Sequence, residues 1–393
     1  MSTHNLLGRL SGIHRMMTEL LENTQEQDCY RTFHPSLAPL AWYFGRAIYL
    51  ETYWLREVVQ GDDDMTSRVR EIFARGALPP REQWQRLPPK DHLLNWAMEL
   101  QDENLMRLAN PSLLPDHPMC EDNRLIYRIL QEHALSYENI LMVLTERRLL
   151  GEEPYQVKAP FVAAAPEVNT GGLSQGHYRI GAKNDMAAFD NELPTQMVEL
   201  SNYRIDKQPA SNANFLRFME AGGYTDDQLW TEAGRAWRSN NAQHPHHWRQ
   251  DQQGNWYSVT INGPFDLISA DPVMGISQHE ATAYANWVAT LGGDFDGAVL
   301  QHEYQWETAK RFDVIEGDGR VWEWCSNSFH PYDEYQPSEY SEGRTGDFDQ
   351  DLLSLRGACL HTQPALRRIS YRNRAEAGTN WLFAGVRLVY PHN

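Results

Sequence analysis

A histidine and a tyrosine lie four positions apart in the stretch LQEHALSYENILMVL, residues 130–144. Apolar residues recur there at spacings of three and four, which predicts an α-helix with His133 and Tyr137 on its apolar face. Two histidines at this spacing would indicate a metal site. Tyr137 can bind a metal as a phenolate only after its hydroxyl loses a proton with an intrinsic pKa of about 10. The pair alone therefore does not predict a metal site.

Arg46 is the third residue that we expect at the same place. It belongs to the apolar stripe of a second predicted helix, and if both stripes face the interior of a bundle, Arg46, His133 and Tyr137 converge in one cavity. Bundle proteins build metal and cofactor sites at such places. Arginine stays protonated and has no lone pair to offer, and its charge repels a dication. The residue types therefore disfavour a divalent metal among these three side chains.

Three alternatives stay open for this trio. Glu51, Glu132 or Glu138 could supply other metal ligands, although the helical count places them off the inward stripe. The trio could be a polar core cluster, in which the histidine bonds the tyrosine or an acidic neighbour and the arginine pairs with a buried carboxylate. The arginine could instead bind the carboxylate or phosphate of a ligand through its planar guanidinium.

The elements that must position these residues are four long amphipathic helices, which predict a four-helix bundle. They are expected over residues 6–21, from Pro39 onward, over 88–109 and over 120–150. Residues 151–175 are rich in Pro, Ala and Gly and are predicted to be a linker. Beyond them, short strand-like runs mix with a few helices. We therefore expect an α+β protein of two domains, a helical bundle at 1–150 and a second domain at 176–393.

The composition limits the classes of partner. The net charge is -18, and no long basic run offsets it, so a nucleic acid is not an expected partner. The four cysteines are widely spaced without a CxxC pair, which indicates a reducing compartment. No apolar run approaches the length of a membrane span, so we expect no membrane association and a cytoplasmic location. A small molecule is the expected partner.

The second domain contains an ordered series of motifs: FDNELPTQMVEL, NFLRFMEAGGYTDDQLW, HEATAYANWVATLGG, LQHEYQWETAKR, GRVWEWCSNSF, LRGACL and SYRNR followed by NWLFAGVRLV. This series resembles the formylglycine-generating-enzyme (sulfatase-modifying factor) family, whose fold is a variant of the C-type lectin fold. The resemblance covers nearly all of residues 176–390. The reaction of that family needs paired active-site cysteines, whereas Cys325 and Cys359 are single and lie within structural motifs.

The combination of a DinB-like helical bundle with this domain resembles the EgtB-like sulfoxide synthases, a non-haem iron family whose relatives make ergothioneine, ovothiol and selenoneine. APLAWYFGR is similar to the family segment SPxxWxLxH, and EHALSYEN is similar to HxxxHxE. The resemblance implies Fe(II) held by three histidines, and their positions fall on Arg46, His133 and Tyr137. The family glutamine that holds the histidine-derived substrate falls on Ser136, and the glutamate two residues beyond the last ligand falls on Asn139.

The resemblance also implies site residues in the second domain. SEYSEG is similar to the segment that carries the catalytic proton-donating tyrosine, which points to Tyr340. The C-terminal pocket wall, whose aromatic rings could face a quaternary ammonium group, falls on Arg372, Asn373, Asn380, Trp381 and Phe383. Ala375 occupies the place of an aspartate that engages the thiol substrate, so γ-glutamylcysteine is not the expected donor.

Two hypotheses follow from these residues. In the first, the protein is an O2-dependent oxidoreductase that forms a carbon–sulfur or carbon–selenium bond on a histidine-derived substrate, with Fe(II) as its cofactor. In the second, it is a metal-free pseudoenzyme that binds a small zwitterionic or anionic ligand between the two domains. The HPHHW stretch, with His244, His246 and His247, is expected in a surface loop and not at a metal.

Overall fold

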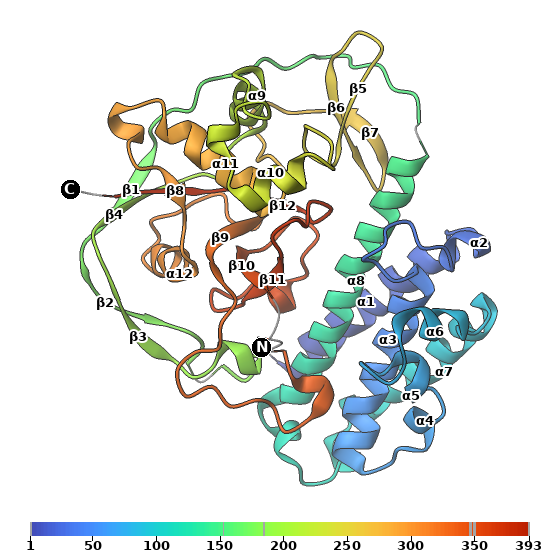
Figure 1. The fold of residues 1–393 in the computed structure, drawn as a ribbon. Coiled ribbons are helices and arrows are strands. Elements are labelled where there is room, and N and C mark those ends of the chain that lie inside the picture. The colour runs from blue at the N-terminus through green and yellow to red at the C-terminus, as the bar shows by residue number, and fades with distance from the viewer. Residues whose placement is uncertain (1, 152, 184, 346–347, 349–350, 392–393) are drawn as a thin grey trace.

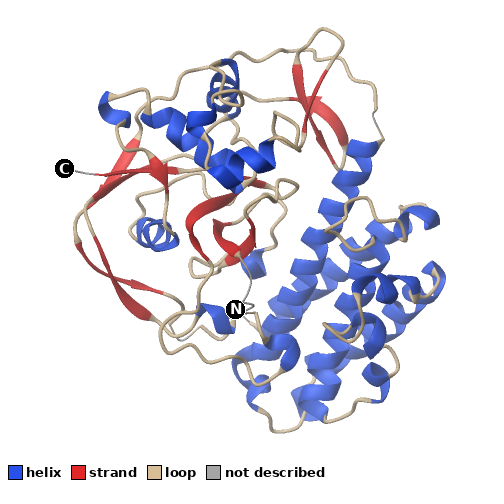
Figure 2. Cartoon of the chain, viewed as in Figure 1, coloured by secondary structure: helices blue, strands red, loops and turns tan. Residues whose placement is uncertain are grey.

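The computed structural model describes residues 2–151, 153–183, 185–345, 348 and 351–391. A helical part formed by the first 150 residues packs beside a second part of mixed strands and helices (Figures 1 and 2). The longest helix, α8 (Arg124–Leu150), runs along the boundary between the two parts and contacts both of them (Figure 1). None of the described helices is long and apolar enough to cross a membrane.

The helical part is built on the long helices that the periodicity predicts. The helices α1, α3, α7 and α8 pack against one another through apolar side chains. The first begins at an N-cap, because the hydroxyl of Ser2 accepts a hydrogen bond from the backbone N–H of Asn5. The elements before α8 are α1 (Thr3–Glu22), α2 (Glu26–Cys29), α3 (Leu40–Thr52), the π-helical η1 (Tyr53–Val59), α4 (Asp64–Ser67), α5 (Arg70–Phe73), α6 (Pro80–Gln85), α7 (Lys90–Ala109), and the 3-10 turns η2 (Pro111–Leu113) and η3 (Pro118–Asn123).

The fourth predicted helix begins later than expected. Residues 118–123 form the 3-10 turn η3, and Asp122 and Asn123 have positive φ values of 50° and 63°. An α-helix cannot pass through this left-handed backbone, so α8 begins at Arg124 instead of near Cys120.

The second part contains small sheets surrounded by helices. The described strands form two four-stranded sheets, ordered β1-β4-β13-β8 and β11-β10-β9-β12, with β2-β3 and β5-β6-β7 as smaller sheets. The strands are β1 (Thr170–Leu173), β2 (Gly176–Ile180), β3 (Gln196–Leu200), β4 (Tyr203–Asp206), β5 (Trp248–Gln250), β6 (Trp256–Thr260), β7 (Gly263–Asp266), β8 (Val299–Leu300), β9 (Trp322–Ser328), β10 (Leu352–Gly357), β11 (Asn373–Glu376), β12 (Ala384–Gly385) and β13 (Leu388–Pro391). The helices and turns are η4 (Asp190–Glu192), α9 (Asn212–Glu220), η5 (Asp227–Leu229), α10 (Glu232–Arg238), α11 (Gln278–Ala289), η6 (Gly293–Phe295), α12 (Glu303–Arg311), η7 (Ser341–Gly343) and η8 (Pro364–Leu366).

The second part begins earlier than residue 176. Strand β1 lies inside the predicted linker and pairs in antiparallel register with β4, Thr170 opposite Asp206. The backbone N–H of Ala164 already donates to the carbonyl of Ala213, 3.0 Å away. The Pro- and Ala-rich composition suggested a linker because it lacks periodicity, but part of the segment is an edge strand.

Candidate functional site

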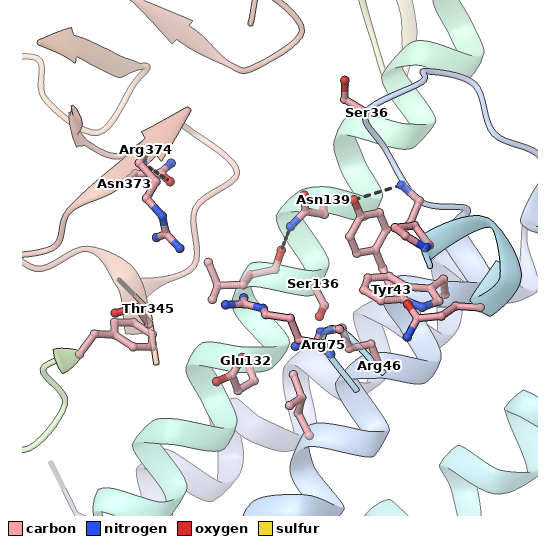
Figure 3. Close-up of a pocket in the computed structure, with 18 of the residues that line it drawn as sticks. Ser36, Tyr43, Arg46, Arg75, Glu132, Ser136, Asn139, Thr345, Asn373 and Arg374 are labelled. Carbon is pink, nitrogen blue, oxygen red and sulfur yellow. Dashed lines mark hydrogen bonds between the residues drawn. The ribbon is translucent and has the colours of Figure 1, made fainter. Parts of the chain in front are cut away.

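A cavity of about 650 Å³ lies between the helical part and the second part (Figure 3). Helices α3 and α8 form one side, the segment from Arg75 to Trp84 forms a second side, and residues 371–374 close it from the second part. We call this cavity the inter-domain pocket. Its lining is mixed, with aromatic rings from Trp42, Tyr43 and Trp84 beside several charged groups.

The residues of α3 and α8 that line the inter-domain pocket include Arg46, Glu132 and Ser136 (Figure 3). Glu132 and Ser136 are four positions apart and therefore lie on one face of α8. Both are largely buried, at 8% and 6% exposure. Arg46 and Ser136 are both among the predicted substrate-binding residues, whereas Glu132 and Ser136 lie here in place of His133 and Tyr137, one residue later on α8.

His133 lies in the core of the helical part and not in the inter-domain pocket. Its side chain is fully buried, and its Nε2 atom is 2.7 Å from Oε2 of Glu51. His14 approaches the same carboxylate oxygen at 2.8 Å. Burial would raise the pKa of Glu51, but the two histidines outweigh burial and hold it below its ordinary value. The alternative in which His133 bonds an acidic neighbour is therefore the one that the structure contains.

Tyr137 faces a third direction. It lines a separate cavity of about 310 Å³ together with Met16, Leu144 and Arg147. Burial raises the pKa of its hydroxyl, which disfavours the phenolate further. The expected convergence of Arg46, His133 and Tyr137 is therefore wrong.

The physical reason is that α8 is buried on several faces at once. One face packs into the helical part, and another meets the second part across the inter-domain pocket. The predicted apolar stripe marks the first face, whereas the polar pocket lies on the second. A helix turns by about 100° per residue, so a one-residue shift moves the side chain to a different face.

The family segment HxxxHxE also fits better one residue earlier. Its positions then fall on Glu132, Ser136 and Glu138, so that the final glutamate is matched. Glu138 is buried and accepts hydrogen bonds from Trp322 Nε1 at 2.6 Å and from the Thr362 hydroxyl at 2.7 Å. The matching glutamate is the signal in the sequence that favours the register in which Glu132 and Ser136 face the pocket.

The inter-domain pocket contains both a carboxylate, that of Glu132, and a guanidinium, that of Arg46. Burial raises the pKa of Glu132 above its ordinary value, and the guanidinium groups of Arg128 and Arg46 oppose this rise. Arg46 donates from Nη2 to Oε2 of Glu342 at 2.8 Å, and its other terminal nitrogen donates to the Phe73 carbonyl. The ion pair with Glu342 joins α3 to the second part at the pocket's edge. Arg46 therefore pairs with a carboxylate, that of Glu342, as one of the three alternatives expects.

Arginines that were not predicted add positive charge. Arg75 and Arg374 line the pocket from opposite parts of the chain (Figure 3). The backbone N–H of Arg75 donates to Oε1 of Glu342, 3.1 Å away. No spacing rule could have brought these residues together, because Arg75 lies in a short-helix segment and Arg374 lies in β11, almost 300 positions later.

Of the predicted C-terminal wall, Asn373 lines the inter-domain pocket. Arg372 also lines the pocket, but its guanidinium is bound within the second part. Its Nε and Nη2 atoms donate to Oε2 and Oε1 of Glu303, each at 2.8 Å. It also donates to the Asn191 and His330 carbonyls. Trp381 lines a neighbouring cavity of about 290 Å³. The substrate-binding roles of these residues stay predictions.

Two other wall residues do not line a described cavity. Phe383 is buried in the core, where its ring lies 4.7 Å from that of His361, and it is not among the residues that line the inter-domain pocket. Asn380 is half-buried and lines neither the inter-domain pocket nor the neighbouring cavity of about 290 Å³. Tyr340 packs on Trp54, with ring centroids 5.5 Å apart, and is not among the pocket-lining residues. Its catalytic role stays a prediction.

The HPHHW stretch is not a surface loop. His247 is fully buried, and Nε2 of His246 lies 2.7 Å from the Glu146 carboxylate of α8. This stretch therefore contributes to the contact between the two parts. The short spacing of its histidines argues against a shared metal and so favours a surface loop, but the sequence does not show that α8 contacts this stretch.

The inter-domain pocket does not offer ligands for Fe(II) at the family positions. Glu132 supplies one carboxylate, Ser136 supplies a neutral hydroxyl, and Arg46 has no lone pair. A non-haem iron site needs about three donor groups with open positions beside them. These residues therefore do not fit the metal, and we derive no chemical step through it.

Comparison with known proteins connects this architecture to two groups. Residues 165–317 match the family model of the sulfatase-modifying factor enzyme 1-like domain. The chain is 24% identical to the hercynine oxygenase of Mycolicibacterium smegmatis, and the match covers 96% of both chains. It is 26% identical to the hercynine oxygenase of Mycobacterium tuberculosis over 54% of this chain and 58% of that relative. The structure of PvdO from Pseudomonas aeruginosa is similar over 59% of this chain and 99% of that one, with 15% identity and a TM-score of 0.41.

Proposed function

From the premise that this chain is a homologue of the hercynine oxygenases and carries a sulfatase-modifying-factor domain, we propose that it binds a histidine-derived zwitterion in the inter-domain pocket. We further propose that binding does not use iron at the family positions. The DinB-like character of the helical bundle and the C-type-lectin-like character of the second part belong to the same proposal. Hercynine, the betaine named by the relatives, is the first ligand to test.

The observation that supports this proposal is the set of Arg46, Glu132 and Ser136 on the wall of one pocket. Guanidinium groups bind carboxylates through paired hydrogen bonds, so the arginines suit the carboxylate of a zwitterion. The Glu132 carboxylate and the rings of Trp42 and Trp84 suit its cationic end through charge and cation–π attraction. The same residues are poor ligands for Fe(II), which is why the proposal separates binding from the metal.

Isothermal titration calorimetry with hercynine tests the proposal on the full chain as purified. We expect binding of one hercynine per chain and the same affinity with and without added Fe(II) under anaerobic conditions. Histidine, which lacks the quaternary ammonium group, is the matched ligand and should bind more weakly. Binding that requires Fe(II), or no binding of either ligand, would contradict the proposal.

A second candidate function is the O2-dependent formation of a carbon–sulfur or carbon–selenium bond on hercynine. The near full-length match to the hercynine oxygenase of M. smegmatis favours it. Oxygen consumption by the Fe(II)-loaded protein with hercynine and a thiol separates the two candidates. Turnover that depends on all three components would support this second function, and its absence beside tight hercynine binding would support the first.

A further inference from the structure

Two histidines and a glutamate meet in the core of the helical part, away from the inter-domain pocket. His14 comes from α1, Glu51 from α3 and His133 from α8, and each offers one ligand atom within 4.8 Å of the others. None of the three lines the inter-domain pocket. We call these residues the core triad.

The geometry of the core triad is that of groups around a common centre. Oε2 of Glu51 is 2.8 Å from Nε2 of His14 and 2.7 Å from Nε2 of His133. Neighbouring ligands of a tetrahedral first-row metal, each about 2.0–2.2 Å from the ion, lie roughly 3.3–3.6 Å apart. The carboxylate oxygen would therefore move roughly 0.5–0.9 Å farther from each imidazole nitrogen when an ion binds among them.

A fourth helix, α7, also contacts the core triad. Asn104 of α7 is fully buried, and its Nδ2 donates to Oε1 of Glu51 at 3.0 Å. Its Oδ1 has no hydrogen-bond partner in the described residues, and neither do the Nδ1 atoms of His14 and His133. In the metal-free chain each Nε2–H donates to the Glu51 carboxylate, which only accepts. Because no group holds Nδ1, the ring proton can move to that atom when a cation binds, and Nε2 then presents its lone pair to the ion.

The negative charge of the buried Glu51 carboxylate also favours binding of a cation at the core triad. Glu51 is fully buried, His133 is fully buried and His14 is 6% exposed. No Lys or Arg side chain forms an ion pair with Glu51 among the described residues. The two imidazoles are therefore the groups that offset its charge, either as proton donors or, with an ion bound among them, as ligands of a dication that neutralises the carboxylate.

We propose that His14, Glu51 and His133 bind one divalent first-row transition-metal ion, of which Zn(II) is the representative. Two imidazoles and a carboxylate are a donor set that zinc accepts, and a turn of the Asn104 amide would offer its unpartnered oxygen as a further donor. The site is closed to solvent, as structural metal sites are. Its role is to hold α1, α3 and α8 together, separately from ligand binding in the inter-domain pocket.

The test uses the full chain without a histidine tag, because a tag binds zinc by itself. After loading with Zn(II) and desalting, we expect about one zinc per chain by mass spectrometry. Loading should also raise the midpoint of thermal unfolding by a few degrees, because the ion binds only the folded chain. Co(II) in place of Zn(II) should give visible absorption bands of a nitrogen- and oxygen-ligated ion.

His14→Gln should lose the metal and the stabilisation, whereas the matched variant His4→Gln should keep both, because His4 is exposed on the same helix. If His14→Gln does not fold, the zinc content and the Co(II) spectrum of the wild-type chain decide. A wild-type chain that retains no zinc and shows no thermal shift would overturn the proposal and leave a metal-free His–Glu–His hydrogen-bond network. Zinc retained at the wild-type level by folded His14→Gln would overturn it as well.

Discussion

The indole N–H of Trp322, at the start of β9, donates a hydrogen bond to the Glu138 carboxylate of α8 across 2.6 Å. The second oxygen of the same carboxylate accepts from the hydroxyl of Thr362. All three residues are buried at the boundary between the two parts. The WEW motif of the second part is thus bonded directly to the helix that carries Glu132 and Ser136, so the two parts share one polar contact beside the inter-domain pocket.

Loss of that carboxylate should destabilise the whole chain. Glu138→Ala leaves two buried donors without an acceptor, and we expect a loss of roughly 2–4 kcal/mol in the free energy of unfolding. Urea denaturation followed by tryptophan fluorescence measures this loss. Asn139→Ala, at the next position of α8, is the control and should cost about 1 kcal/mol or less. Equal losses in the two variants would show that the contact of Glu138 with Trp322 is not specific.

The sequence predicts the elements of this protein better than their contacts. The four long helices follow from periodicity and are present, and residues 165–317 match the family model that the ordered motifs resemble. The register of α8 does not follow, because periodicity marks every buried face and does not say what covers it. His133 and Glu132 are both buried, yet one faces Glu51 and the other faces the inter-domain pocket.

The remaining parts of the site depend on long-range packing. Glu342 reaches Arg46 from nearly 300 positions away, and His14 reaches Glu51 from another helix. Such pairs have no local pattern in a single sequence. The helical pattern places Arg46 on the pocket side of α3, as the structure has it, but its partner Glu342 comes only from the fold.

Two neighbouring residues of α8, Ser136 and Tyr137, test whether the ligand binds in the inter-domain pocket. Ser136→Phe places a ring into the inter-domain pocket, and we expect at least about a tenfold loss of hercynine affinity, or about 1.4 kcal/mol. Tyr137→Phe changes a residue that faces the smaller cavity and should leave the affinity unchanged. Calorimetric titration of both variants compares them directly. A larger loss of affinity in Tyr137→Phe than in Ser136→Phe would contradict this and would support the prediction from the apolar stripe, in which Tyr137 faces the ligand.

Glu280 should make stability depend on pH in the second part. It is fully buried in the first turn of α11, where it accepts hydrogen bonds from the backbone N–H and the hydroxyl of Ser277 at 2.7 and 2.8 Å, and from the hydroxyl of Tyr224. Burial raises its pKa from 4.5 to about 7, and these bonds offset only part of that rise.

Because the folded chain holds this proton more tightly than the unfolded chain, the contribution of Glu280 to stability is fully present below pH 4.5. It is lost as the pH rises to about 7, by roughly 3 kcal/mol in total. Urea denaturation of wild type and Glu280→Gln at pH values from 5 to 8 measures the difference between them. The wild type should lose stability relative to the variant over this range. A difference that does not change with pH would show that Glu280 does not titrate in the folded chain.

Restoring histidines at the pocket-facing positions should create a metal site there. The variant Arg46→His/Glu132→His/Ser136→His places three imidazoles on the wall of the inter-domain pocket, and we expect it to bind one more equivalent of Co(II) or anaerobic Fe(II) than the wild-type chain. The variant Arg46→His/Tyr137→His is the matched comparison. It should gain no metal, because Tyr137 faces a different cavity and His133 is bound to Glu51. Metal content after anaerobic loading measures both variants. A gain in the double variant and none in the triple variant would place the pocket on the other face of α8 and remove the basis for the ligand-binding proposal.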